Sequence, residues 1–109
     1  MRQIRISDTA ANFLVFFPYL PAGHLIHATM VNIAKAYTVA MAVHDNPGAM
    51  KGDLQNYTYL LDNEAEGANI NVIWDGYIPI IQGQGVGVTF RVVSIGDQVE
   101  VTLLVELDE

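Results

Sequence analysis

Residues 98–107, QVEVTLLVEL, alternate between apolar and polar side chains with a period of two. Successive side chains of a β-strand point to opposite faces, so this stretch predicts a strand with one apolar face and one solvent-facing face, with Leu104 as an exception on the latter. The apolar face would consist of Val99, Val101, Leu103, Val105 and Leu107. Residues 87–94, GVTFRVVS, predict a partner strand joined to it through Ile95-Gly96-Asp97.

Upstream of this pair, further short apolar runs predict strands between turn signals. The predicted strands are residues 2–6, 12–17, 70–74 and 77–81. Ser7-Asp8 and Pro21-Ala22-Gly23 indicate turns, and Asp75-Gly76 is a two-residue hairpin signal. Pro79 indicates an edge strand or a bulge, because proline cannot donate to a strand ladder.

Residues 24–44 fit either one helix or two strands. The frequent Val, Ile and Thr, the missing helix cap and the short turn available at Ala34-Lys35 favour two strands. Residues 45–69 form the least regular stretch and predict a long loop, with a helical turn or a strand inside it around Leu54, Tyr57 and Leu60-Leu61.

Together these segments make seven to nine short strands in 109 residues, with turn signals about every ten residues. We expect a single domain over residues 1–109, all-β, folded as a jelly-roll-like antiparallel β-sandwich with one long irregular loop over about 45–69.

Charge and composition exclude several classes of partner. The formal charge is −7 and no basic stripe is present, which argues against nucleic-acid binding and against an anionic membrane surface. With no cysteine, the chain has no disulfide and no thiolate chemistry. No signal peptide is evident, and polar residues interrupt the most apolar window, so a cytoplasmic location is expected unless the chain belongs to a virion.

The residues suited to catalysis or metal binding do not form a recognisable pattern. His24 and His27 would face opposite sides of a strand, and His44 is distant in sequence, so surface or strand-end histidines are expected. Residues 83–87, GQGVG, lack the following helix that a phosphate loop requires. We therefore predict no catalytic residue, no cofactor and no metal site, and hence no enzyme.

The acidic stretch allows one alternative. A calcium ion could take its oxygen ligands from Asp62, Asn63, Glu64 and Glu66, although the EF-hand spacing is missing and a solvated face explains them more simply.

Low charge and clustered aromatic residues point towards an interface. Charged residues make up only 16% of the chain, and residues 12–17, NFLVFF, lack the alternation of a half-exposed strand. Either both faces of this strand are buried, or one meets another subunit. The candidate interface residues are Phe13, Phe16, Tyr57, Tyr59, Trp74 and Tyr77. Filling the core is favoured for Trp74, and both roles stay open for Tyr57 and Tyr59.

The chain resembles the small β-sandwich head decoration (cement) proteins of tailed bacteriophages. The resemblance lies in residues 4–10, IRISDTA, in residues 17–45, FPYLPAGHLIHATMVNIAKAYTVAMAVHD, and in residues 78–107, IPIIQGQGVGVTFRVVSIGDQVEVTLLVEL. It implies a structural virion protein, a homo-oligomer with a trimer favoured, which binds a capsid or other shell protein and carries no catalysis and no cofactor.

Two other functions remain open. The first is a ligand-binding module of the carbohydrate type, in which Trp74, Tyr77 and loop acids form the site. The second is a small metal-dependent β-barrel enzyme that uses His24, His27 or His44.

Overall fold

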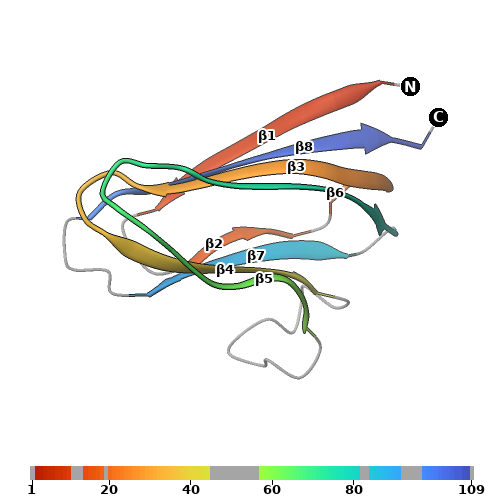
Figure 1. Cartoon of the computed structure of the whole chain (residues 1–109). Helices are drawn as coiled ribbons and strands as arrows, with labels where there is room; N and C mark the ends of the chain where they lie inside the picture. The colour runs from red at the N-terminus through yellow and green to blue at the C-terminus, as the bar shows by residue number, and fades with distance from the viewer. Residues whose placement is uncertain are drawn as a thin grey trace.

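The computed structural model describes residues 2–10, 14–18, 20–44, 57–81, 84–91 and 97–108, which form eight strands and no helix. The strands are β1 (Gln3–Ala10), β2 (Leu14–Phe17), β3 (Gly23–Asn32), β4 (Tyr37–His44), β5 (Tyr57–Glu66), β6 (Val72–Ile80), β7 (Gly85–Arg91) and β8 (Val99–Leu107). They build two four-stranded antiparallel sheets that face each other (Figure 1). The predicted all-β sandwich is confirmed.

The pairing of the strands defines the topology. The pairs β4–β5, β3–β6, β2–β7 and β1–β8 are nested within one another, so the chain follows one long hairpin that is folded over. Additional pairs, β3–β8 and β4–β7, complete a first sheet of order β1-β8-β3-β6 and a second of order β2-β7-β4-β5. Two sheets of this kind, built from eight strands, form a jelly roll.

The hydrophobic core fills the space between the two sheets. In β8 the burial alternates along the strand as the sequence predicts, and the odd-numbered residues from Val99 to Leu107 are buried. The facing sheet contributes the buried side chains of Val39, Met41, Val86, Val88 and Phe90. Each such side chain contributes about 1.5–3 kcal/mol of transfer free energy, so these alternating strands hold the sandwich together.

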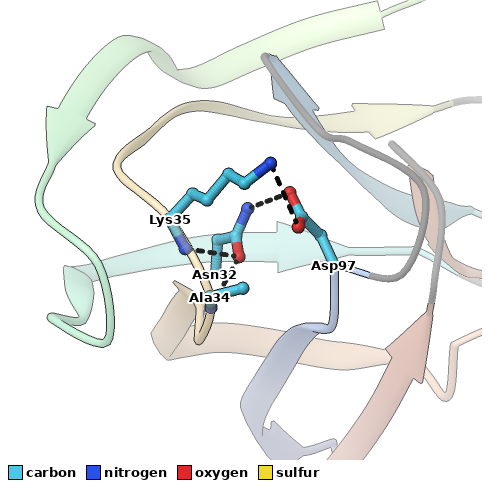
Figure 2. A network of polar contacts seen from close by, with 4 residues as sticks. All are labelled: Asn32, Ala34, Lys35 and Asp97. Atoms are coloured by element: carbon cyan, nitrogen blue, oxygen red, sulfur yellow. Dashed lines mark hydrogen bonds and ion pairs between the residues drawn. The ribbon is translucent and has the colours of Figure 1, made fainter.

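The region that fitted either a helix or two strands forms two strands in different sheets. β3 ends at Asn32 and β4 begins at Tyr37, with bends at residues 33–35. Asn32 fixes this crossing, since its Oδ1 accepts hydrogen bonds from the backbone N–H groups of Ala34 (3.0 Å) and Lys35 (3.3 Å). Figure 2 shows how Asp97 completes the network, 3.4 Å from Asn32 Nδ2 and 3.8 Å from Lys35 Nζ.

The predicted hairpin between residues 87–94 and 98–107 is wrong. β7 pairs with β2 and β4 in the second sheet, whereas β8 pairs with β1 and β3 in the first. Alternation predicts that a segment is a strand, but it does not say which strand lies beside it. The predicted turn at Ser7-Asp8 is also wrong, because both residues lie inside β1 and pair with β8.

Two further predictions need correction. The expected loop over 45–69 contains the ten-residue strand β5, while residues 45–56 lie outside the described part of the chain. Asp75-Gly76 is not a hairpin but lies within β6, where the pairing with β3 shifts between Leu25 and His27. A Cβ atom at Gly76 would lie 2.5 Å from the ring of Trp74, so the glycine leaves room for this ring.

Candidate functional site

Strand β6 forms one edge of the first sheet and exposes large apolar side chains. Ile73 is 59% exposed, Tyr77 is 56% exposed, and Ile81, just after the strand, is 64% exposed. The outer edge of β6 has no partner strand among the described residues. An edge of this kind can pair with another chain through its free N–H and C=O groups.

A second set of side chains lies on the outer face of the first sheet, next to this edge. His27 Nδ1 lies 2.6 Å from Asp75 Oδ1, which links β3 to β6 through a hydrogen bond between side chains. The His24 ring stacks on Tyr77, with centroids 4.0 Å apart and an interplanar angle of 11°. The Tyr77 hydroxyl donates to Glu106 Oε1 at 3.3 Å. These contacts fix the polar groups of three neighbouring strands relative to one another.

The ionisation of Tyr77 reflects this environment. Desolvation, followed by the negative charge of Glu106, raises the pKa of the Tyr77 hydroxyl above its ordinary value of 10.0. The hydroxyl therefore stays protonated at neutral pH and can donate to the Glu106 carboxylate.

A shallow groove crosses the same outer face. It has a volume of about 370 Å³, and its lining residues come from β1, β3 and β8. They are Arg5, Ser7, His27, Thr29, Thr102 and Leu104. The hydroxyls of Ser7 and Thr102 lie 3.0 Å apart and form a hydrogen bond across β1 and β8. A second hollow, of about 330 Å³, lies between Ile6, Ser7 and Asp8 of β1 and residues Phe17, Pro18, Leu20 and Pro21.

The predicted interface residues do not lie on one surface. Trp74 is half-buried and packs against the hydrophobic core, whereas Tyr59 on β5 and Tyr77 on β6 are exposed in different sheets. Phe16 belongs to β2 and Tyr57 to β5, but the side chains of both lie outside the described part, as does Phe13 altogether.

The histidines are surface or strand-end residues as expected, but two details of their placement differ. His24 and His27 share the outer face of the first sheet, because the irregularity between Leu25 and His27 reverses the alternation. His44 ends β4 as expected for a strand-end residue, but it is fully buried.

The acidic residues proposed as calcium ligands lie along a strand. Asp62, Glu64 and Glu66 belong to β5, where Asp62 Oδ1 is 4.0 Å from Arg91 Nη2. Within the described ranges, no group of three or more histidine, aspartate or glutamate side chains is arranged to hold a metal ion.

Sequence reasoning did not identify Arg5, Ser7, Thr29 and Thr102 as groove residues. Their polar positions alternate with apolar ones along their strands, which indicates a solvent face. The groove depends on β8 lying between β1 and β3, and the sequence alone does not reveal this order.

No protein-family model matches the chain, and no curated protein is similar enough in sequence to count as a relative. The part of the chain that the structure describes contains no helix long and apolar enough to cross a bilayer. Function is therefore inferred from the fold and from two features of the first sheet, the exposed edge of β6 and the groove on its outer face.

Proposed function

We propose that this protein is a structural subunit that assembles with further copies of itself through the exposed edge of β6. The observation that carries the proposal is the nine-residue edge strand with Ile73 and Tyr77 outward and Ile81 beside it. Left uncovered, such an edge favours uncontrolled aggregation, and soluble proteins usually protect it with charges or cover it.

The charges of this edge also favour contact with a second copy. Asp75 is the single charged residue of β6, and His27 of the neighbouring strand already contacts its carboxylate. Each edge therefore brings only one carboxylate from its own strand to such a contact, although the chain as a whole carries a charge of −7.

The finer proposal is a virion protein of the capsid decoration type, a trimer that stiffens a protein shell. Its support is the resemblance to decoration proteins of tailed bacteriophages, together with a jelly roll, an architecture that occurs in viral capsid proteins. Jelly rolls also form lectin domains and cupins, so the fold alone does not assign the function. Co-sedimentation of the labelled chain with undecorated phage capsids tests the shell partner directly.

Light scattering coupled to size-exclusion chromatography tests the assembly. An edge-to-edge pair has about twice the 12.0 kDa of one chain, and the favoured trimer has about three times this mass. Ile73→Lys places a charge on the β6 edge and is expected to shift the mass towards that of a single chain. Gln3→Lys, on the opposite edge strand β1, is the matched control and should leave the mass unchanged.

Circular dichroism of each variant separates loss of assembly from loss of folding. A wild-type chain that stays at 12.0 kDa at high concentration contradicts the proposal. Equal masses for the wild type and a folded Ile73→Lys variant would show that β6 does not form the interface.

A further inference from the structure

The groove on the outer face of the first sheet contains one cationic side chain, that of Arg5. Among the described residues, no carboxylate lies within ion-pair distance of the Arg5 guanidinium, whereas Lys35 and Arg91 contact Asp97 and Asp62 respectively. Arg5 lies opposite Leu104 of β8 in the strand register, and both residues line the groove. Its five N–H donors can therefore bind a ligand, and their planar arrangement matches either a carboxylate or a phosphate.

Hydroxyl and imidazole groups surround this cation in fixed positions. Because Ser7 and Thr102 share one hydrogen bond, one hydroxyl proton of the pair remains free to donate. Asp75 holds His27 through Nδ1, which leaves the Nε2 atom for another partner. Thr29 adds a further hydroxyl group, and Leu104 adds an apolar surface. Donors, acceptors and an aliphatic contact are thus combined in one groove.

The surrounding acids limit the charge of the ligand. Glu100 and Glu106 lie on the same face of β8 as Thr102 and Leu104, and Asp75 lies beside His27. These carboxylates can accept hydrogen bonds from ligand hydroxyls, but they repel a multiply charged anion. One guanidinium matches one carboxylate, so a single negative charge fits this face better than a phosphate dianion does.

We propose that the groove formed by Arg5, Ser7, His27, Thr29, Thr102 and Leu104 binds a sugar acid, with the ligand carboxylate on Arg5 and its hydroxyls on the neighbouring side chains. The groove volume of about 370 Å³ accommodates a six-membered sugar ring, since a cavity of about 150 Å³ already holds benzene. The site does not rest on the proposed assembly, because its residues come from β1, β3 and β8 and none from the edge strand β6, although Ile73 lies on the same face opposite Thr29.

The test is a titration of the ¹⁵N-labelled full chain, followed by two-dimensional NMR, with sodium D-glucuronate. D-glucose and inorganic phosphate at matched ionic strength serve as comparison ligands. Saturable shifts at the amides of Arg5, Ser7, His27 and Thr102, weaker for glucose and for phosphate, are the expected result. Arg5→Gln should weaken glucuronate binding at least about tenfold, because it removes a charge-assisted pair.

The matched control is Arg91→Gln, which removes a guanidinium from the second sheet and should leave glucuronate binding unchanged. Thr102→Val keeps the charge, removes one hydroxyl and should weaken binding by a smaller factor than Arg5→Gln. Equal affinity for glucose would overturn the role of the carboxylate, and equal affinity for phosphate would reduce the groove to an unspecific anion site. No shift with glucuronate at these residues would overturn the proposal.

Discussion

The two edge strands of the first sheet, β1 and β6, differ in how their free backbone groups are protected from pairing with another chain. β1 presents Gln3, Arg5, Ser7 and Thr9 to solvent, and its polar side chains discourage pairing with another chain. β6 presents Ile73 and Tyr77 and has a single charged residue, Asp75. An edge that is protected by its own side chains needs no partner, whereas the apolar edge gains stability when a second chain covers it.

The strands also differ in how the rest of the molecule holds them. β1 is held by its ladder with β8 and by the exposed Ser7–Thr102 hydrogen bond. β6 has, besides its ladder with β3, a buried anchor from the opposite sheet, the hydroxyl of Tyr37. This hydroxyl accepts from Val72 N–H at 3.1 Å, and its proton faces the carbonyl oxygens of Met30 and Ile70. The difference predicts unequal responses to the loss of one hydroxyl.

Tyr37→Phe is expected to have the largest effect. It leaves the Val72 N–H and the Ile70 carbonyl without their partner near the start of β6, at a cost of about 2 kcal/mol in the free energy of unfolding. Urea denaturation measures the loss, and hydrogen exchange should show faster exchange in β6 than in β1. Equal acceleration in both strands would contradict the special anchoring of β6.

Alkaline pH probes the same anchor with a smaller effect. Desolvation by burial, which outweighs the opposing hydrogen bond from Val72, raises the pKa of Tyr37 above its ordinary value of 10.0. A pKa that is higher in the folded state contributes stability below the unfolded value, and this contribution is lost as the pH rises through the folded value. Unfolding free energies should therefore fall above about pH 10 in the wild type and fall less in Tyr37→Phe. An identical decline in both proteins would exclude Tyr37 as the cause.

Ser7→Ala on β1 should have the smallest effect. The Ser7–Thr102 hydrogen bond is exposed, and water can replace it, so we expect a change within about 0.5 kcal/mol. The same urea denaturation measures it. A loss as large as that of Tyr37→Phe would show that β1 depends on side-chain anchoring as much as β6 does.

The sequence predicts the elements of this fold better than their arrangement. The alternation of β8 and the two strands within residues 24–44 follow from side-chain patterns and are confirmed. The sequence did not predict β5 firmly because four of its last five residues, 62–66, are polar, as an edge strand with two irregularities allows. Asp75-Gly76 has the composition of a hairpin, yet pairing with β3 keeps the strand continuous through an irregularity.

The groove was beyond prediction for a related reason. Arg5 and Thr102 are 97 positions apart in the chain and share a face only because β8 pairs with β1. His24 and His27 join the same face only because the irregularity in β3 reverses the alternation. Such a surface is created by long-range pairing and by a local defect, and neither leaves a sequence pattern of its own.

The nested pairing has a consequence for the synthesis of the protein. β8 lies between β1 and β3, with Gln3 opposite Glu106, so the first sheet cannot close until the ribosome has released β8 (Figure 1). β4 and β5 can pair much earlier, whereas β1 cannot pair until its partner β8 is synthesised, nearly a hundred residues later. Such distant contacts slow folding, and the nascent chain is therefore expected to acquire its second sheet before its first.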